Sequence, residues 1–410
     1  MSMEESRKPA IRFKGFTDDW EQRKLDDNLI EYKETTTINN QYPALTSSRK
    51  GIFLQTEYFA GNQIASENNT GYNVVPYGYF TYRHMSDDEI FHFNINDIVE
   101  NGIVSTLYPV FTTDENLDSK YLQYQLNNGH EFSEFAVLQK QGGSRTYMYL
   151  NKLKQLHLTV PVSIDEQKKI AVLLEEVDNL ITLHQRKYDK LVNIKKSMLE
   201  KMFPKDGEVV PEIRFEGFTD DWEQRKFSEL VQIERGGSPR PIDDYITDNP
   251  NGLNWVKIGD APQQGHYITK TTEKIKPEGL SKTREVHPGD LILSNSMSFG
   301  KPYIMGIDGC IHDGWLLIRD NDNIFDLTFL CHLLGTPQML NQYRSFAAGS
   351  TVNNLNKELV GNTIITIPKI DEQQVLGQYL ENIDNLITLH QRKLEKLQNI
   401  KKSMLERMFV

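Results

Sequence analysis

The feature of this sequence that most limits its possible folds is an internal repeat. The ten residues GFTDDWEQRK occupy positions 15–24 and return unchanged at 217–226. A longer block, DEQKKIAVLLEEVDNLITLHQRK from Asp165, returns in similar form from Asp371, and DNLITLHQRK and NIKKSMLE are identical in both copies. Repeated segments at the same relative positions in the two halves of a 410-residue chain favour two copies of a structural unit over a single large core.

Both copies of the longer block have the apolar periodicity of an α-helix. The expected seam residues step by three and four: Ile170, Leu173, Val177, Leu180, His184, Lys187, Leu191, Ile194 and Met198, then Leu376, Tyr379, Ile383, Leu386, His390, Lys393, Leu397, Ile400 and Met404. About 39 residues make a rod of roughly 58 Å, and such a helix needs a partner along its seam. We expect the two copies to pair, antiparallel because a two-fold axis would relate them. The alternative is two amphipathic helices packed on separate cores.

Polar residues interrupt both seams at the same place. His184 and Lys187 lie in the first copy, and His390 and Lys393 lie in the second. Two histidines without nearby acids or thiols are a weak indication of metal binding, so we predict no metal site. A polar break of this kind can instead fix the register and orientation of paired helices.

Composition narrows the class of protein. Charged residues make up 25% of the chain, and no apolar run approaches the roughly 18 residues of a membrane span. The start, MSMEESRKPAI, lacks the apolar stretch of a signal peptide, so we expect a cytoplasmic protein. Cys310 and Cys331 alone provide neither a disulfide framework nor a four-thiolate zinc site. A net charge of -11 means that any contact with nucleic acid must use local patches.

The stretches between the repeated segments hardly resemble one another. Both contain short apolar runs, such as IFHFNINDIV and DLILSNSMSF, broken by turn residues, which indicates mixed strands and helices. We therefore predict a mixed α/β fold with a first globular domain at 1–164, a first long helix at 165–204, a second globular domain at 205–370 and a second long helix at 371–410. The repeated leads and long helices enclose two different stretches, called the first and second inserts below. This arrangement suggests a scaffold that presents two binding specificities.

The first insert contains a segment in which aromatic and basic residues alternate. VVPYGYFTYRHM, residues 74–85, includes Tyr77, Tyr79, Phe80, Tyr82, Arg83 and His84. Aromatic rings beside basic groups can stack on bases and contact phosphates, which makes Arg83 a candidate DNA contact. A strand at the edge of the core gives the same pattern, so both interpretations stay open.

A second pair of candidate segments lies near the end of each insert. KQGGSRTYMYLNKL at 140–153 aligns with FAAGSTVNNLNKEL at 346–359. Gly-Ser would let the backbone approach a duplex, and the polar residues after it would reach base edges or phosphates: Arg145, Tyr147, Asn353 and Asn354. A turn followed by a helix cap would also explain these segments.

The second insert adds three more candidates. RGGSPRP at 235–241 lacks the full phosphate-binding loop pattern, so Arg240 is better interpreted as a phosphate contact on a surface loop. In HPGDLILSNSMSFGK at 287–301, Asn295 and Lys301 follow a buried strand, where polar contacts to a ligand are common. A turn that needs small polar residues accounts for this segment equally well.

Signatures of catalysis are mostly absent. The sequence has no Asp/Asn-Pro-Pro-aromatic tetrapeptide for amino-group methylation and no glycine-rich cofactor loop after a strand. A nuclease-like pattern assembled from Asp27, Glu31 and Lys33 is common by chance in charged sequences. No nucleophile, base and orienting acid stand out, so we predict no catalytic and no cofactor-binding residue.

Taken together, these features resemble the specificity (S) subunit of bacterial type I restriction-modification systems over essentially the whole chain. The resemblance rests on the duplicated plan, on VPVSIDEQ and IPKIDEQ before the helices, and on the helix ends KKSMLEKMF and KKSMLERMF. GGSPRP, NWVKIGD and HPGDLIL in the second insert look like a target-recognition domain. The GFTDDWEQRK leads resemble those of staphylococcal members.

The resemblance implies a DNA-binding subunit without catalytic activity of its own. Two target-recognition domains would each read one half of a split site in double-stranded DNA, and the coiled-coil helices would set the unread spacer. Two methyltransferase subunits would dock on the chain and use S-adenosylmethionine to methylate adenine at N6. Two restriction subunits would add translocation and cleavage with ATP and Mg²⁺. The chain itself would hold no cofactor and contact no membrane.

Two other classes of function remain as alternatives to this reading. In one, the chain is a coiled-coil scaffold whose inserts bind proteins. In the other, it is a self-sufficient nuclease or methyltransferase. The resemblance also bears on the negative charge, because partner subunits would supply much of the phosphate contact. Isolated chain should then bind DNA weakly, with a small dependence on salt.

Overall fold

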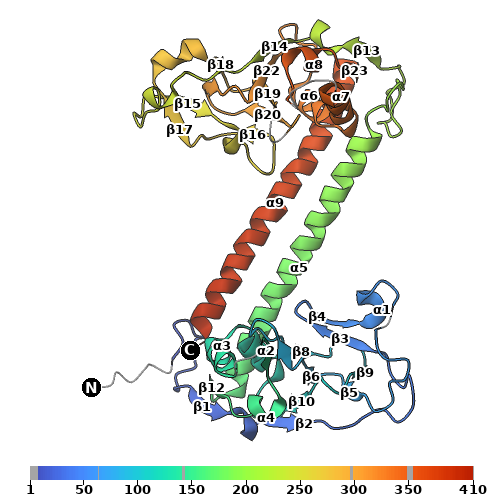
Figure 1. Cartoon of the computed structure of the whole chain (residues 1–410), viewed down its shortest axis with the longest axis vertical. Helices are drawn as coiled ribbons and strands as arrows, with labels where there is room; N and C mark the ends of the chain where they lie inside the picture. Colours follow the sequence, from blue (N-terminus) through green and yellow to red (C-terminus); the bar gives the residue numbers. More distant parts are fainter. Residues whose placement is uncertain (1–7, 63, 141–143, 296–298, 349–353, 410) are drawn as a thin grey trace. The chain divides into compact units, whose positions relative to one another are not determined.

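The computed structural model describes residues 8–62, 64–140, 144–295, 299–348 and 354–409, and the chain divides into two compact units (Figure 1). Unit 1 comprises residues 1–182 and 395–410, and unit 2 comprises residues 183–394. The long helices α5 (Ile164–Lys201) and α9 (Ile370–Met408) each contribute a part to both units. Among the described residues, none of the helices combines the length and the apolar run required to cross a bilayer.

The parts of α5 and α9 run antiparallel within each unit. In unit 2, His184 contacts His390 with 2.8 Å between the Nδ1 atoms, and Lys195 pairs with Asp384 at 2.5 Å. In unit 1, Lys401 pairs with Asp178 at 2.6 Å. The two ion pairs are repeat equivalents, because their members are separated by the same 206 residues as the two histidines. The predicted antiparallel pairing is confirmed.

The apolar seam predicted from the sequence is wrong by one residue in its middle turns. Leu386 is 45% exposed, whereas its neighbour Ile387 is 8% exposed and faces inward. Leu394 is likewise buried in place of the exposed Lys393, and the first helix repeats this pattern with Leu180 and Lys187 exposed. Steps of three and four fit more than one face of a helix with 3.6 residues per turn, so periodicity alone did not fix the inward face.

Unit 1 is built from small antiparallel sheets and short helices. The central sheet has the order β2 (Leu29–Glu31), β10 (Val110–Thr113), β6 (Phe80–Thr81) and β8 (Asn94–Ile95). Three further strand pairs are β3 (Leu45–Ser48) with β4 (Gly51–Leu54), β5 (Asn73–Pro76) with β9 (Asn101–Val104), and β7 (Met85–Ser86) with β11 (Thr146–Tyr147). The helices are α1 (Gln55–Tyr58), α2 (Ser119–Asn128), α3 (His130–Leu138) and α4 (Leu150–Leu153).

The core of unit 1 contains aromatic residues that the sequence left open as base-stacking candidates. Phe80 and Tyr82 are fully buried, and Phe80 stacks on Phe111 with 4.7 Å between ring centroids. Ile170 from α5 and Met408 from α9 belong to the same cluster. For Phe80 and Tyr82 the structural interpretation is therefore correct, and both long helices are anchored in this core.

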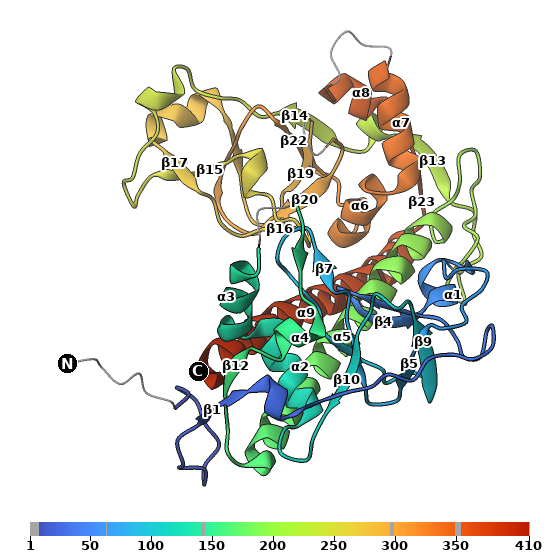
Figure 2. The same ribbon diagram turned by 60° about the horizontal axis from the view of Figure 1, so that its bottom comes forward.

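Unit 2 has two larger sheets. One has the order β14 (Gln232–Arg235), β22 (Trp315–Arg319), β19 (Leu291–Ser294), β20 (Pro302–Met305) and β16 (Tyr267–Ile268). The other has the order β17 (Glu273–Ile275), β15 (Leu253–Val256), β21 (Gly309–Ile311) and β18 (Arg284–Val286). Figure 2 shows α6 (Leu327–Leu334), α7 (Pro337–Ala348) and α8 (Lys357–Gly361) on one side of the first sheet, with β15 and β17 on the other.

The repeated leads form the first strand of each unit. EQRK of the first lead is β1 (Glu21–Lys24), which pairs antiparallel with β12 (His157–Val160), the strand before α5. EQRK of the second lead is β13 (Glu223–Lys226), which pairs in the same way with β23 (Ile364–Ile367) before α9. The tryptophan of each lead, Trp20 or Trp222, is buried in the core of its unit. The repeated lead thus forms the strand that pairs with the strand before each long helix, and it helps to attach that helix to its domain.

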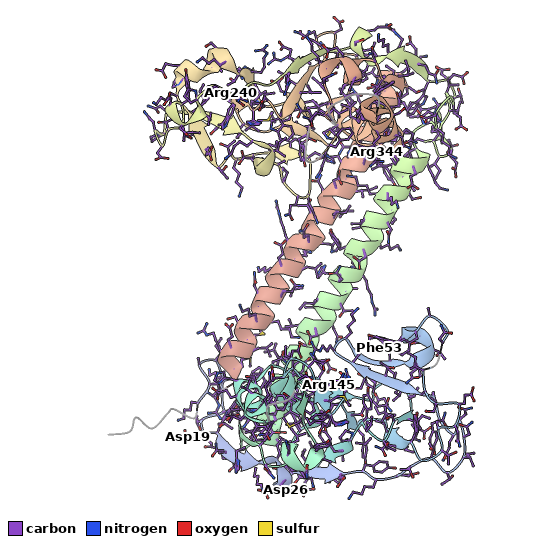
Figure 3. All side chains as sticks on the ribbon, in the orientation of Figure 1. Asp19, Asp26, Phe53, Arg145, Arg240 and Arg344 are labelled. Carbon is purple, nitrogen blue, oxygen red and sulfur yellow. The ribbon has the colours of Figure 1, made fainter. Side chains whose placement is uncertain are left out.

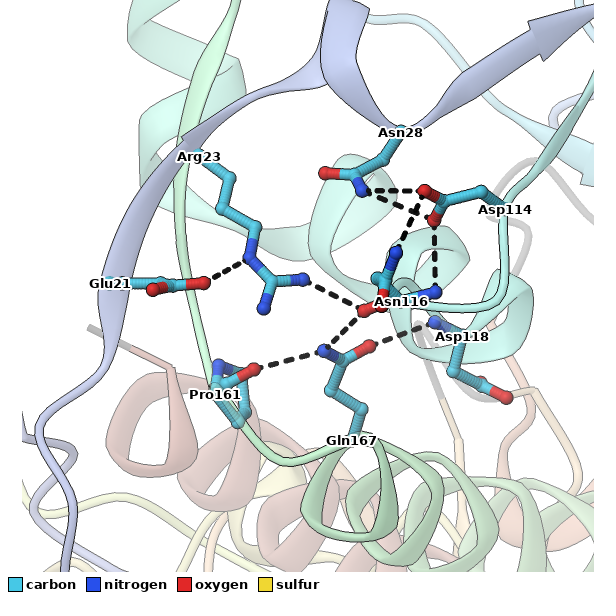
Figure 4. A network of polar contacts seen from close by, with 8 residues as sticks. All are labelled: Glu21, Arg23, Asn28, Asp114, Asn116, Asp118, Pro161 and Gln167. Atoms are coloured by element: carbon cyan, nitrogen blue, oxygen red, sulfur yellow. Dashed lines mark hydrogen bonds and ion pairs between the residues drawn. The ribbon is translucent and has the colours of Figure 1, made fainter.

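The glutamine of each DEQ segment ties the start of a long helix to its domain. Gln167 accepts a hydrogen bond from the backbone N of Asp118 at 2.8 Å and donates to the carbonyls of Asn116 and Pro161 (Figure 4). Gln373 repeats all three bonds with Asp326, Ile324 and Pro368. Because Asp118 and Asp326 are the N-caps of α2 and α6, each glutamine joins two helix starts.

The glutamate of each DEQ segment makes a buried ion pair that sequence reasoning missed. Arg12 binds Glu166 through two hydrogen bonds of 2.6 and 2.8 Å, and Arg214 binds Glu372 through two of 2.7 Å. These side chains are almost fully buried. The sequence signal was the triplet IRF that precedes both leads, at 11–13 and 213–215.

Candidate nucleic-acid interface

In unit 1, the pairing of β7 with β11 joins two candidate segments that lie about 60 residues apart in the sequence. Met85 lies opposite Tyr147, and the backbone N of Met148 donates to the carbonyl of His84 at 2.7 Å. The segment that contains Arg83 is therefore bound to the segment that contains Arg145 and Tyr147. Strand pairing therefore brings the segments of three predicted contact residues next to one another.

A groove of about 620 Å³ opens beside this strand pair. Three cationic side chains line it, those of Arg49, Lys50 and Arg83, against one carboxylate, that of Asp87, and the remaining lining combines hydroxyl, aromatic and apolar groups. Arg83, a sequence candidate, is exposed, whereas Arg49 and Lys50 were not predicted because nothing in their own segment distinguishes them from ordinary surface residues. The groove is a local basic patch of the kind that a chain with net charge -11 needs in order to bind nucleic acid.

Aspartates hold two arginines at this surface in different ways. Asp87 accepts from Nε of Arg145 at 2.9 Å, and among the described residues the terminal amino groups of Arg145 have only a weak contact with Met85 Sδ at 4.0 Å (Figure 3). Asp88 instead binds both terminal amino groups of Arg49. Hydrogen bonds from Arg49 and then Ser86 hold the pKa of Asp88 well below its usual range. Only Arg145 keeps its terminal fork for another acceptor.

Three aromatic rings stack beside the arginines. The His84 ring stacks on Tyr149 with 5.1 Å between centroids, and Tyr149 is nearly parallel to Tyr147 at 5.9 Å. Tyr147 is 37% exposed and Tyr149 is 48% exposed, so the stack offers ring surface to solvent. Tyr149 was not predicted, although the alternation in TYMY places both tyrosines on one face of an extended chain.

In unit 2, the loop around Asp313 gathers other candidate segments. Its carbonyl accepts from Asn295 Nδ2 at 2.8 Å and from Arg235 Nε at 3.2 Å. Its carboxylate accepts from Ser238 at 3.0 Å and lies 3.9 Å from Arg240. The RGGSPRP segment and the end of β19 thus meet at a residue that no sequence motif indicated.

The glycines of RGGSPRP are required by close backbone approach. A Cβ on Gly236 would lie 2.2 Å from the carbonyl oxygen of His312, and one on Gly237 would lie 2.4 Å from that of Lys282. Both distances are far inside van der Waals contact. This packing fixes the base of the loop, while the side chain of Arg240 near its tip is 83% exposed and faces solvent (Figure 3).

The remaining candidates of unit 2 differ in exposure. Asn295 is buried, so in this conformation its amide supports the Asp313 loop, and a DNA contact by it stays a prediction. The partly exposed Lys301 donates to the carbonyl of Gln263 at 3.3 Å. Asn354 is exposed, and Asn353 lies outside the described residues.

The Leu-Asn-Lys segment was also interpreted as a helix cap, and this is correct for one of its two copies. Asn356 is the N-cap of α8, and its side chain accepts from the backbone N of Leu359 at 2.8 Å. In unit 1 the corresponding letters lie inside α4, which begins at Leu150 and has no side-chain cap. The same letters therefore serve different local structures, and only the copy in unit 2 is a cap.

Among the described residues, one group of side chains has the composition of a metal site. It comprises His266, His332 and Asp384 of unit 2. None of these three residues belongs to unit 1.

Comparison with known proteins gives consistent matches. A family model described as type I restriction modification DNA specificity domain matches residues 17–193 and 219–399. The chain is 25% identical over 320 residues to the type I restriction enzyme MjaVIII specificity subunit of Methanocaldococcus jannaschii, covering 75% of this chain and 73% of that protein. It is 24% identical over 294 residues to the putative type I restriction enzyme MjaX specificity subunit of the same organism, covering 70% and 67%.

Solved structures match the fold over nearly the whole chain. The S subunit of a type I restriction-modification system from M. genitalium has a TM-score of 0.57 and 13% identity, and the match covers 98% of this chain and 99% of that one. A structure described as the basis of complex assembly and conformational transition of the type I R-M system has a TM-score of 0.50 and 16% identity, covering 95% and 97%. These matches support the mixed fold.

Proposed function

This chain belongs to the type I restriction-modification DNA specificity family and has a DNA sequence-specificity role, and we propose that its two units read the two halves of a split target. The observation that carries the proposal is that the family domain occurs twice in one chain, at 17–193 and 219–399. Each copy has the same strand and helix frame, while the described surfaces that the two inserts present differ. Two different reading surfaces fit a target with two different halves.

In unit 1, we assign the reading of bases to Arg145 and the exposed tyrosines. Asp87 accepts only from Nε of Arg145, so the terminal amino groups keep the fork that matches O6 and N7 of guanine in the major groove. Tyr147 and Tyr149 present ring surface next to this fork, suited to apolar contact with bases or sugars. Arg83, which lines the groove, would contact a phosphate.

In unit 2, we assign phosphate and base contacts to Arg240, Lys301 and Asn354, with Asn353 and Asn295 as further candidates. The Arg240 side chain is 83% exposed, and the packed glycines before it fix the base of its loop. A fixed loop with an exposed arginine can position a phosphate contact at low entropic cost. These assignments rest on exposure and charge.

The specificity family is non-catalytic, so methylation and cleavage would belong to other subunits. We propose docking of two methyltransferase subunits that carry S-adenosylmethionine and methylate adenine at N6, and of two restriction subunits that use ATP and Mg²⁺. The α5 and α9 pair would set the length of the unread spacer. The family match favours this role over a scaffold that reads no DNA. A cytoplasmic location, where the target DNA lies, and a staphylococcal origin, based on the leads alone, are part of the proposal.

The test is a selection from random duplex DNA by the purified chain bound to a methyltransferase subunit. Wild-type complex should enrich one split motif. Arg145→Ala should relax one position of one half, by about 1–3 kcal/mol of discrimination, and leave the other half intact. Asn354→Ala in unit 2 is the matched variant and should affect the other half alone, whereas Arg240→Ala, which removes a phosphate contact, should lower the affinity for all sequences alike.

Two outcomes would reject the proposal. One is a stable complex that enriches no sequence, which would restore the scaffold alternative. The other is a motif in which Arg145→Ala and Asn354→Ala weaken the same positions, because separate reading by the two units would then be excluded.

A further inference from the structure

A buried polar cluster in unit 2 joins its domain to both long helices. His266 comes from the segment before β16, His332 from α6 and Asp384 from α9. Nε2 of His266 lies 3.0 Å from Oδ2 of Asp384, and Nε2 of His332 lies 3.7 Å from the same oxygen. All three ligand-type atoms lie within 4.8 Å of one another. Three segments far apart in sequence therefore direct two imidazoles and a carboxylate to one point.

The spacing of these atoms is close to that of a metal site. Bonds of about 2.1 Å to a tetrahedral Zn²⁺ place neighbouring ligand atoms about 3.4 Å apart. The separations of the two ring nitrogens from Oδ2 of Asp384, 3.0 and 3.7 Å, lie on either side of that value, and all three ligand-type atoms lie within 4.8 Å of one another. Small side-chain movements, rather than a rearrangement of the backbone, would complete the geometry.

Burial shields the cluster from water. The His332 side chain is 2% exposed, that of Asp384 is 12% exposed and that of His266 is 14% exposed. A metal ion would bind deprotonated ring nitrogens and the carboxylate, so its affinity should fall at low pH.

We propose that His266, His332 and Asp384 bind a divalent transition-metal ion of the Zn²⁺ class through Nε2, Nε2 and Oδ2. Two imidazoles and one carboxylate suit a borderline metal such as Zn²⁺ or Co²⁺ and are a poor set for Mg²⁺ or Ca²⁺, which require more oxygen ligands. Water would fill the fourth position. This site is separate from DNA reading and does not depend on the function proposed above.

Lys195 of α5 has two opposing effects on this site. Its Nζ binds Oδ1 of Asp384 at 2.5 Å, which orients Oδ2 toward the imidazoles as an outer-shell partner does. The same Nζ lies 3.3 Å from Nε2 of His266, so the ammonium competes with the metal for that nitrogen. Its flexible stem lets the ammonium withdraw while it keeps the bond to Oδ1. We therefore expect metal binding to be weakened by Lys195 but not prevented.

The repeat contains a natural comparison in unit 1. Lys401 and Asp178 are the repeat equivalents of Lys195 and Asp384. Tyr124 takes the place of His332, because each lies six residues after the capping aspartate of its helix, and its hydroxyl donates to Asp178 at 2.8 Å. Unit 1 thus has the ion pair with a phenol where unit 2 has imidazole. The ion pair is common to both units, and the potential ligand set is specific to unit 2.

Metal binding would give the cluster a mechanical role. A bound ion would crosslink α9, α6 and the segment before β16 by bonds stronger than the existing hydrogen bonds. The domain of unit 2 would then be clamped to the helix pair at Asp384. Unit 1 would lack this clamp.

The experiment is a Zn²⁺ titration of the untagged full-length chain after chelator treatment, followed by calorimetry, with Co²⁺ absorption as a second readout. We expect one saturable site and the visible bands of tetrahedral Co²⁺. His332→Gln and His266→Gln should each weaken binding at least about tenfold, because each removes one of three protein ligands. Lys195→Met should strengthen it, since the competing ammonium is gone.

The controls separate this site from the rest of the chain. Asp178→Asn, in the equivalent pair of unit 1, and His184→Gln, in the other imidazole pair, should leave the Zn²⁺ affinity unchanged. Thermal unfolding without metal identifies any variant that fails to fold, and the two histidine variants provide independent tests. The proposal is overturned if wild-type chain shows no saturable binding, if affinity survives both histidine changes, or if only Lys195→Met binds.

Discussion

Replacing Gln373 by leucine tests whether the DEQ segment stabilises the junction between helix and domain. The side chain is buried and makes three hydrogen bonds, to the backbone N of Asp326 at 3.0 Å and to the carbonyls of Ile324 and Pro368 at 3.2 and 3.0 Å. Leucine keeps the approximate volume but leaves these three backbone groups without their partner. At about 1 kcal/mol net for each bond, the expected loss in free energy of unfolding is about 3 kcal/mol.

The assay is urea unfolding monitored by tryptophan fluorescence. Three of the four tryptophans, Trp222, Trp255 and Trp315, belong to unit 2 and are buried there, so fluorescence reports mainly on that unit. Gln374→Leu is the matched control, because its side chain is exposed in the same helical turn. It should change the free energy of unfolding by less than about 0.5 kcal/mol.

The repeat provides an independent copy of the experiment. Gln167 makes the same three bonds in unit 1 (Figure 4), so Gln167→Leu should cost a similar free energy there, measured by hydrogen exchange in α2. A loss below about 1 kcal/mol for Gln373→Leu, or one no larger than that of Gln374→Leu, would refute the reasoning. The DEQ segment would then mark the family without stabilising the junction.

Three further predictions concern the helix pair, a loop and the charge of the chain. Burial and the charges of Lys393 and Lys187 lower the pKa of His184, and burial and His184 lower the pKa of His390. The uncharged histidine pair therefore contributes its full stability to the fold above the ordinary histidine pKa of about 6.5, and this contribution is lost as the pH falls. The melting temperature should therefore fall between about pH 7 and pH 5, and less so in a His184→Asn, His390→Asn variant; an equal fall in both would contradict this. Gly236→Ala should lower the free energy of unfolding of unit 2, measured in urea, by about 1–3 kcal/mol, because its Cβ would lie 2.2 Å from a carbonyl oxygen. Gly259→Ala is the control, since its Cβ would meet open space and should leave the free energy unchanged. Equal effects of the two substitutions would exclude the close approach as the cause. The isolated chain should bind DNA with a log–log salt slope smaller in magnitude than about 3, measured by fluorescence anisotropy, and a steeper slope would mean that this acidic chain supplies many phosphate contacts itself.

Sequence reasoning was successful where the information is local and repeated. The 3.6-residue period predicted two long helices, and the antiparallel pairing expected from the repeat corresponds to a two-fold axis perpendicular to them, because an axis along the helices would relate a parallel pair. Periodicity did not decide between Leu386 and Ile387 as the inward residue, because both fit steps of three and four. The four-part division of the chain and the DNA contacts stay predictions.

The reading surfaces were only partly accessible from sequence, because they depend on contacts between distant segments. Arg83, Arg145 and Tyr147 were selected individually, but their proximity follows from the β7 and β11 pair, which no local pattern specified. Asp313 was missed because one aspartate in a turn has no distinguishing pattern until Ser238, Arg240 and Asn295 pack around it. Phe80 and Tyr82 show the converse, since alternating aromatics fit a core strand as well as a stacking platform.

The most direct test of the central claim is a map of methylated adenines in the genome of a methylation-free host that expresses this chain with its methyltransferase subunit. The account predicts one modified motif, with two fixed halves and a constant gap. Substitutions in unit 1, such as Arg145→Ala, should change only one half. A stable complex of the two proteins that modifies no motif, or that modifies a single uninterrupted sequence, would contradict the claim that two units read two half-sites.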